Sequence, residues 1–274
     1  MPPRVLLLGG HGKVSRLLTP LLLSRGWNVT SVVRNPDHKD DIVSLKQKEH
    51  PGTVDVLVSS LDDVQSDAAA QEILDRVDPD YVVWSAGAGG KGGPSRTIAI
   101  DQNAAKHFIT VSFASPRVSK FLMVSYNGSR RNRPSWMNDE DWNVVVNTNT
   151  KLIPTYAAAK IEADQYQVAR TEWRKKQSHL PQKFQSICIR PGALTDEPGT
   201  GKVQLGKTHT VGGVPRADVA TVIDRVLARD DTHGWIDLMG GEEPIDEAIE
   251  RVVRDKVNAL DEEDVQGIID RYQF

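Results

Sequence analysis

The sequence predicts an α/β fold in which a doubly wound parallel sheet carries helices on both faces. Short apolar runs typical of buried strands alternate with longer segments typical of helices, and that alternation predicts right-handed crossovers over a parallel sheet. Several strand-like runs end in glycine or small polar residues, which predicts a binding cleft at the carboxyl edge of the sheet. The strand-like runs cover residues 5–8, 27–33, 54–58, 81–84, 121–125, 186–189 and 235–238.

The first two strands and the helix between them are expected within residues 5–33. The apolar run 5–8 ends at glycines, Leu18 and Leu22 then recur at helical spacing, and Gly26 is typical of a helix end. The first 36 residues hold Arg4, Lys13, Arg16, Arg25 and Arg34, and no acidic residue precedes Asp37. Such a bias is also typical of a mitochondrial transit peptide, but the strand, turn and helix pattern favours a binding site.

Helix-like segments precede the later strands, at residues 67–77, 97–114, 156–176 and 218–228. Two irregular stretches, 87–94 and 127–154, interrupt the alternation, and the second is long for a connector in a compact domain. The second stretch carries Arg130, Arg131, Arg133, Trp136 and Trp142. Three interpretations stay open for it: a solvated loop over packed tryptophans, a wall of a substrate site, or a nucleic-acid contact.

Composition narrows the class of protein. The chain has 274 residues with 34 basic against 37 acidic side chains, and the net charge of −3 argues against nucleic acid or a membrane as partner. The single cysteine, Cys188, excludes an internal disulfide and is expected in the core. No metal site is expected, because the seven histidines show no ligand spacing. We therefore expect a cytoplasmic protein that acts on a small molecule.

The glycine-rich turn Gly9-Gly10-His11-Gly12-Lys13-Val14-Ser15 lies where a predicted strand feeds a predicted helix. Glycine lets the backbone approach a pyrophosphate, and the amino end of a helix offers free N–H groups and a positive dipole end. Arg34 follows the second strand, where an acidic residue would bind the ribose hydroxyls of NAD and an arginine suits the 2′-phosphate of NADP. The sequence therefore predicts NADP as the cofactor, with NAD as the alternative.

Tyr156 and Lys160 are four residues apart in an alanine-rich helical stretch, so they share one helix face. A nearby ammonium favours the phenolate, which predicts a lowered pKa for Tyr156. Ser125, at the end of a predicted strand, could hydrogen-bond a carbonyl oxygen. A Tyr and a Lys at this spacing often occur by chance, so the order of features matters: the glycine turn, Ser125, the Tyr156 helix, then Arg190-Pro191-Gly192.

In that order the chain resembles the short-chain dehydrogenases/reductases, and more closely their atypical NAD(P)-binding branch related to the NmrA-like proteins and the sugar-nucleotide epimerases. The resemblance covers most of the chain and includes Arg34-Asn35-Pro36, the segments 190–194 and 215–220, and Met239-Gly240-Gly241. It implies a Rossmann-type fold. We expect one NAD(P)-binding domain over residues 1–274, with a small substrate cap from 127–155 and 193–215.

The resemblance also implies roles for site residues. Tyr156 would be the acid/base, Lys160 would bind the nicotinamide ribose and tune Tyr156, and Ser125 would orient the substrate. The expected cofactor-binding residues are Gly9, Gly10, His11, Gly12, Lys13, Val14, Arg34, Ser60, Leu61, Ala86, Gly87, Tyr156, Lys160, Pro191 and Gly192.

Three positions depart from the pattern of the family. Ser15 stands where the third glycine is usual, and Ser60 precedes Leu61 where relatives place an aspartate near the adenine. Asp101 stands where the short-form enzymes have an asparagine, which weakens the case for their usual proton relay.

The leading hypothesis is therefore an NADP-dependent oxidoreductase that reduces a carbonyl or oxidises an alcohol, with Tyr156 as the proton donor in reduction. A non-catalytic NAD(P)-binding redox sensor is the first alternative, although a pure sensor has no need of Ser125, Tyr156 and Lys160 together. An NAD-dependent epimerase or dehydratase is the second. The substrate and the oligomeric state stay open.

Overall fold

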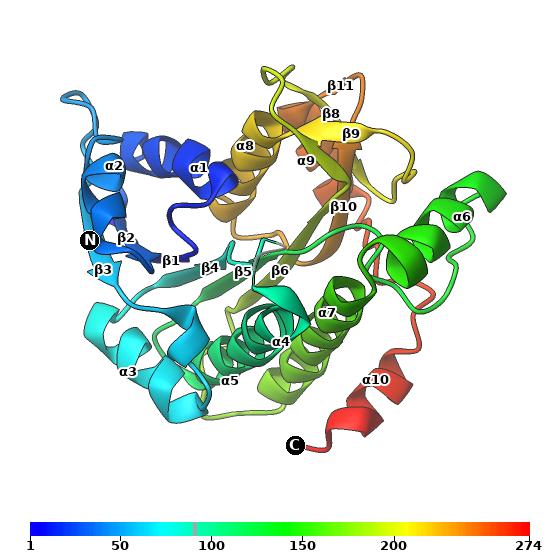
Figure 1. Ribbon diagram of the computed structural model, residues 1–274, viewed down its shortest axis with the longest axis horizontal. Coiled ribbons are helices and arrows are strands. Elements are labelled where there is room, and N and C mark those ends of the chain that lie inside the picture. The colour runs from blue at the N-terminus through cyan, green and yellow to red at the C-terminus, as the bar shows by residue number, and fades with distance from the viewer. Residues whose placement is uncertain (90–91) are drawn as a thin grey trace.

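The computed structural model describes residues 1–89 and 92–274 and builds them around a nine-stranded sheet of order β11-β8-β10-β6-β5-β4-β1-β2-β3 (Figure 1). The parallel strands are β1 (Arg4–Leu8), β2 (Asn28–Val33), β3 (Val54–Val58), β4 (Tyr81–Trp84), β5 (Lys120–Val124), β6 (Gln185–Pro191) and β10 (Gly234–Gly240). At one edge, β8 (Lys202–Gly206) runs antiparallel to both β10 and β11 (Glu243–Pro244). A separate parallel pair joins β7 (Ala193–Thr195) to β9 (Gly213–Pro215).

Helices cover both faces of the sheet (Figure 1). One face carries α1 (Lys13–Ser24), α8 (Arg216–Leu227) and α9 (Ile245–Arg254), and the other carries α3 (Asp67–Val77), α5 (Ala105–Ala114), α7 (Pro154–Lys175) and α10 (Val265–Tyr272). Three shorter helices are α2 (Lys39–Val43), α4 (Gly93–Thr97) and α6 (Asp139–Asn147). A π-helical segment, Ile98–Ala104, joins α4 to α5.

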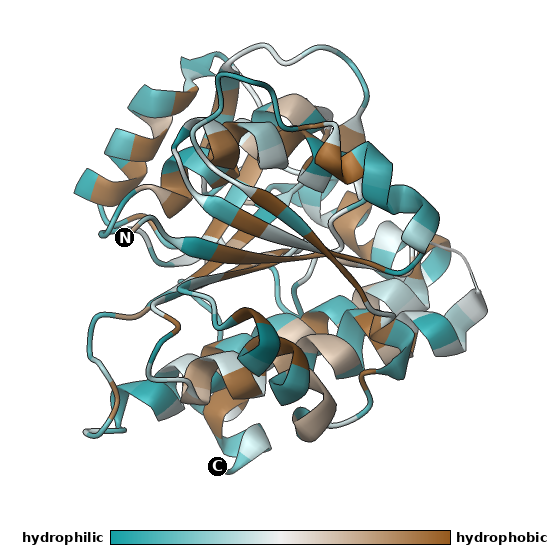
Figure 2. Ribbon diagram, turned by 90° about the vertical axis from the view of Figure 1, so that its left-hand side faces the viewer, coloured by the Kyte–Doolittle hydropathy of each residue, from teal (hydrophilic) through white to brown (hydrophobic). Residues whose placement is uncertain are grey.

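The strands are apolar on both faces because both faces are covered. In β1, Val5 and Leu7 pack into the core beneath α1 and α8, while Leu6 and Leu8 pack into the core beneath α3 and α5. Figure 2 shows the result, with hydrophobic strands between two layers of helices whose outer sides are largely hydrophilic. The alternation along β1 therefore divides one apolar run between two cores.

The structure confirms the predicted fold class. Strands β3 and β4 and helix α3 occupy the predicted residues 54–58, 81–84 and 67–77. The antiparallel edge is an addition to the predicted parallel sheet: the chain returns from β7 to β8 without a helix, and an antiparallel strand needs no crossover. Within the irregular stretch 87–94, residues 90 and 91 lie outside the described residues.

The stretch 127–154 is not simply a solvated loop, because Arg130 lies in the core. The Arg130 side chain is 0% exposed, and its Nη2 lies 2.6 Å from Asp237 Oδ2. On β6, Arg190 binds the other oxygen of Asp237 at 2.9 Å and reaches Asp164 of α7 at 3.2 Å. We call Arg130, Arg190, Asp164 and Asp237 the buried charge cluster. It anchors the start of the stretch to β6, β10 and α7.

Smaller expectations are met elsewhere. Cys188 is buried in β6, where burial raises the pKa of its thiol, so the prediction of a core residue is confirmed. Asp264 accepts a hydrogen bond from Gly267 N and caps α10. Within the described ranges, no helix combines the length and the apolar character needed to span a membrane.

Candidate functional site

Two cavities lie along the carboxyl edge of the parallel strands. The first cavity, of about 260 Å³, is lined by residues that follow β1, β2, β3 and β4. The second cavity, of about 530 Å³, is lined by residues that follow β5 and β6 and by the two segments 127–155 and 193–215. The strand order reverses between β1 and β4, which is where α/β sheets bind their ligands.

The glycine turn leaves the floor of the first cavity as bare backbone. Gly9 has a φ of +84°, and a Cβ atom there would lie 2.6 Å from Ala86 Cα. A Cβ on Gly10 would lie 2.6 Å from Ser31 Cβ. Gly12 precedes α1, whose first turn has no side-chain cap and no acidic residue. A side chain at Gly9 or Gly10 would clash with Ala86 or Ser31, so the tight turn needs glycine there, and it presents the positive end of α1 to a phosphate group.

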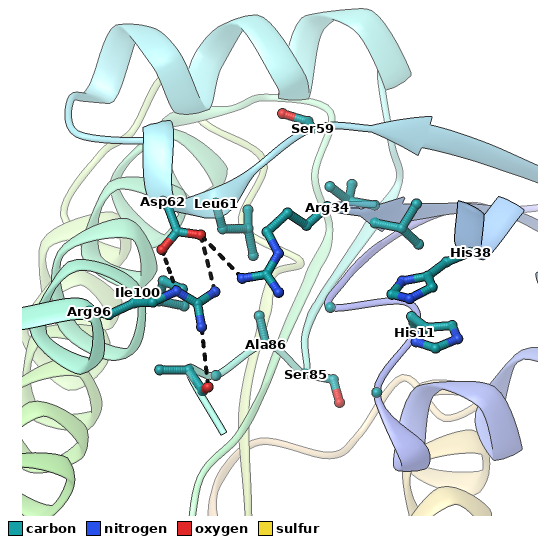
Figure 3. A pocket seen from close by; sticks show the side chains of 16 residues that line it. His11, Arg34, His38, Ser59, Leu61, Asp62, Ser85, Ala86, Arg96 and Ile100 are labelled. Carbon is teal, nitrogen blue, oxygen red and sulfur yellow. Dashed lines mark hydrogen bonds and ion pairs between the residues drawn. The ribbon is translucent and has the colours of Figure 1, made fainter. Parts of the chain in front are cut away.

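Arg34 reaches into the first cavity beside an ion pair (Figure 3). The carboxylate of Asp62 accepts from Arg96 Nε at 2.7 Å and from Arg96 Nη2 at 3.1 Å, and lies 3.7 Å from Arg34 Nη1. Hydrogen bonds from Arg96 and from Ser60, with the charge of Arg34, hold the pKa of Asp62 below its ordinary value. Arg96 thus forms a bidentate ion pair with Asp62, and the Arg34 guanidinium faces the cavity.

Two histidines complete the wall of the first cavity. The rings of His11 and His38 stack with 3.6 Å between their centroids, and His11 Nε2 lies 3.0 Å from Asp41 Oδ2. In Figure 3, Arg34 lies between this stacked pair and the Asp62–Arg96 ion pair. Of the charged and titratable side chains in this lining, two are arginines, two are histidines and one is a carboxylate. The balance favours an anionic ligand.

The structure brings most of the sequence-predicted cofactor residues to the two cavities. The first cavity is lined by Gly9, His11, Gly12, Arg34, Leu61, Ala86 and Gly87, and the second by Ser125, Tyr156, Pro191 and Gly192. The other predicted residues lie outside both linings: Gly10 and Val14 are buried, Lys13 pairs with Asp196, and Ser60 accepts a hydrogen bond from Asp62 N. Lys160 is 1% exposed.

Sequence reasoning missed the three charged or titratable residues His38, Asp62 and Arg96 of the first cavity. Asp62 lies two residues after Ser60, where an acidic residue was sought and not found. The sequence therefore did contain an acidic residue near the expected place, two positions after Ser60. Arg96 carried no such signal, because its place depends on how the segment after β4 folds back over Asp62.

Tyr156 begins α7 and faces the second cavity beside Tyr126, with 5.5 Å between the ring centroids. Lys160, one turn along α7, donates to the carbonyl of Val124 at 3.0 Å. Burial raises the pKa of Tyr156, and Asp101, Tyr126 and Asp164 raise it further. The prediction of a lowered pKa for Tyr156 was therefore wrong, because desolvation of the phenol is the largest influence on it.

Asp101 lies beside Gly87 and Ala88 of the first cavity, in the π-helical segment before α5. Its Oδ2 accepts from Ala88 N at 2.9 Å, and its Oδ1 has no hydrogen-bond partner among the described residues. Burial raises its pKa, while the charge of Lys160 opposes that rise. A Cβ on Gly87 would lie 2.8 Å from Asp101 Oδ1, so the glycine lets this carboxyl approach the backbone.

The two segments around the second cavity are joined by one carboxylate. Asp141 of α6 lies 2.7 Å from His209 Nδ1, and its other oxygen accepts from Thr210 N at 2.8 Å. Burial opposes the ionisation of Asp141, but His209 and two backbone N–H groups hold its pKa below its ordinary value. His209, which showed no partner in the sequence, therefore ties 193–215 to 127–155. That these segments form a substrate cap stays a prediction.

The glycine cradle, the cation-lined first cavity and the strand order together define a dinucleotide-binding α/β protein. The chain belongs to the family described as NAD(P)H-binding, which matches residues 9–230. This agrees with the resemblance to the atypical NAD(P)-binding branch, and the chain has the fold of NAD(P)-binding oxidoreductases and epimerases. Within the described residues, no group of three or more His, Cys, Asp or Glu side chains could hold a metal ion.

Known proteins similar to this chain extend over nearly its whole length. A Schizosaccharomyces pombe protein, "UPF0659 protein C216.03", is 34% identical over 88% of this chain and 91% of its own. The Bacillus subtilis "Uncharacterized sugar epimerase YhfK" is 28% identical over 91% of this chain and 100% of its own. A solved structure from Bacillus halodurans, provisionally assigned as an NAD-dependent epimerase/dehydratase, is 26% identical with a TM-score of 0.69. The match covers 91% of this chain and 99% of that one.

Proposed function

We propose that this protein is an NADP-dependent oxidoreductase of the short-chain dehydrogenase/reductase type, which interconverts a carbonyl compound and an alcohol. One observation carries the proposal: a cation-lined cavity over a glycine cradle and a second cavity presenting Tyr156 lie along the same edge of the sheet. A dinucleotide with its phosphates on the cradle would extend along this edge toward Tyr156. Bound NADPH would supply the hydride.

The residues of the first cavity favour NADP over NAD. Arg96 already binds both oxygens of Asp62, and Arg34 stands 3.7 Å from the same carboxylate. A ribose 2′-phosphate beside Arg34 would gain a charge-assisted, fork-like pair that a 2′-hydroxyl cannot form. The stacked rings of His11 and His38 lie on the other side of Arg34.

The residues of the second cavity supply the proton chemistry. The raised pKa of Tyr156 keeps its phenol protonated at neutral pH, as reduction of a carbonyl requires. Ser125 donates its own hydrogen to Asp164 Oδ2 at 2.6 Å, so its oxygen is left as an acceptor. Tyr156 is therefore the donor to the substrate oxygen. The expectation that Ser125 hydrogen-bonds a carbonyl oxygen is not met, because its hydrogen is used by Asp164, and Ser125 could only accept a hydrogen bond from the alcohol. Lys160 holds the start of α7 to the end of β5.

The test measures binding and turnover separately. NADPH should bind, a panel of carbonyl compounds should contain a substrate, and Tyr156→Phe should lower kcat by about 10²–10⁴-fold without weakening NADPH. Tyr126→Phe is the matched control, because Tyr126 lines the same cavity but donates its hydroxyl to Asn149. NADPH binding with no turnover, and no effect of Tyr156→Phe, would instead identify a redox sensor.

An epimerase or dehydratase differs in its cofactor balance. It would release product without net change in the cofactor and would retain NAD through purification, whereas the proposed enzyme consumes one NADPH for each carbonyl reduced.

We propose that the oxidoreductase acts in the cytoplasm, with no nucleic-acid or membrane partner.

A further inference from the structure

The second cavity is mostly apolar, and its apolar lining reaches the surface. Val144, Ile153 and Val211 line it and are 39%, 37% and 52% exposed. They come from α6, from the residue before α7 and from the segment before β9, so three separate segments contribute to this exposed apolar rim. Large aliphatic side chains left exposed around a cavity are typical of a site whose ligand covers them.

Most polar side chains in this lining are already bonded within the protein. The Ser125 hydroxyl binds Asp164, Tyr126 binds Asn149, Asn127 binds the backbone of His209, and Thr210 binds Asp141. A ligand rich in hydroxyl groups would have to compete with these bonds. The cavity thus offers a nucleotide sugar few polar partners.

Arg216 is the one charged residue among the described residues that line the second cavity. Its Nη1 donates to Asp196 Oδ1 at 2.7 Å, and Asp196 Oδ2 accepts from Lys13 Nζ at 2.5 Å. No other nitrogen of Arg216 has a hydrogen-bond partner in the described part of the chain. Two cations share one carboxylate here, which leaves this trio one positive charge in excess.

We infer that the substrate is a mostly apolar carbonyl compound that carries one carboxylate, and that Arg216 binds this carboxylate. The guanidinium fork matches a carboxylate, and a single negative charge balances the excess charge of the Lys13–Asp196–Arg216 trio. The inference rests on the proposed function, because Tyr156 in the same cavity sets where the carbonyl lies. It adds the class of substrate, which the chemistry of Tyr156 alone leaves open.

The test compares octanoate with octan-1-ol, which share a chain length and differ in charge. Calorimetric titration of the protein, with and without NADPH, should give tighter binding of octanoate. Arg216→Gln should weaken the binding of octanoate by about tenfold or more and leave the binding of octan-1-ol unchanged. Arg16→Gln is the matched control, since Arg16 lines a neighbouring cavity with Arg216 but is absent from this one.

Asp196→Asn should change the affinity for octanoate in the opposite direction to Arg216→Gln. Asp196 competes with the ligand for Arg216, so its neutral variant should bind octanoate severalfold more tightly. Equal loss of octanoate and octan-1-ol in Arg216→Gln, or no change in either, would overturn the inference. So would a matching loss of NADPH, because Arg216 would then serve the cofactor.

The two proposals fail in different measurements. If Tyr156-dependent carbonyl reduction is found while Arg216→Gln leaves octanoate binding intact, only the class of substrate is wrong. If NADPH does not bind, or no carbonyl compound is turned over, the proposed oxidoreductase is wrong whatever octanoate does.

Discussion

The hydroxyl of Ser125 donates to the carboxylate of Asp164, with 2.6 Å between Oγ and Oδ2, and both side chains are buried. The same oxygen of Asp164 lies 3.2 Å from Arg190 Nη1. A residue of the proposed substrate site is thereby fixed to the buried charge cluster. Site geometry and core stability depend on the same contact.

Ser125→Ala should therefore cost stability as well as activity. Removing the hydroxyl leaves Asp164 with less solvation, and a lost bond to a buried charged group costs about 1–3 kcal/mol. Urea unfolding measures the change. If Ser125 only oriented the substrate, kcat would fall while the free energy of unfolding stayed the same.

Arg34→Gln should weaken the binding of NADPH by about tenfold or more and leave the binding of NADH nearly unchanged. Only NADPH carries the 2′-phosphate that Arg34 would bind. Fluorescence titration of both cofactors measures the ratio, with NADH as the internal control. An equal loss of both cofactors would place Arg34 at a part that they share and would remove the argument for NADP.

The raised pKa of Tyr156 predicts opposite pH profiles for the two directions of reaction. Reduction needs the phenol, which stays protonated through neutral and mildly alkaline pH, so kcat/KM for the carbonyl should stay level from about pH 6 to 9. Oxidation of the alcohol needs the phenolate, so its kcat/KM should rise with pH over the same range. A reductive rate that falls near neutrality in the wild type, and not in Tyr156→Phe, would contradict this.

Asp101→Asn should gain stability relative to the wild type as pH rises. Burial raises the pKa of Asp101 in the folded protein, so the folded state binds more protons than the unfolded state just above the ordinary aspartate pKa. The stability of the wild type therefore falls with pH across that window, whereas asparagine does not titrate. Unfolding of both proteins at about pH 4 and pH 7 measures the difference. A pH-independent gap between the two proteins would contradict the prediction.

Arg130→Gln should destabilise the protein by about 3–5 kcal/mol, because it leaves a carboxylate of the buried charge cluster without one of its two cations. Arg133→Gln is the control: Arg133 is partly exposed and pairs with the exposed Asp139, so its loss should cost about 1 kcal/mol or less. Similar losses in both variants would mean that Arg130 is solvated despite its burial.

Local patterns of apolar residues were enough to predict the parallel strands of the sheet. Strands β1, β4 and β5 are short, almost wholly buried apolar runs between the two layers of helices, and such runs can be recognised without any knowledge of their neighbours. The short strands β7, β8, β9 and β11 carry no such run, because they pair only at the rim. Their places depend on contacts between distant segments.

The candidate site divides in the same way. The glycine turn and Arg34 follow directly from the strands that precede them, so their positions could be read from the sequence. Asp62 and Arg96 meet across 34 residues, and Arg130 meets Asp237 across 107. The sequence does not show whether an arginine in a loop is solvated or buried. That depends on whether the folded chain brings it to a carboxylate.

The carboxylate of Asp141 holds His209 and Thr210 and so links α6 to the segment before β9. Val144 lies on α6 and Val211 in the segment before β9, and both belong to the exposed apolar lining of the second cavity. Moving one of these elements away from the other would strip a buried carboxylate of its donors. The exposed apolar lining is therefore fixed here by a contact inside the protein, and a bound molecule would meet a preformed surface.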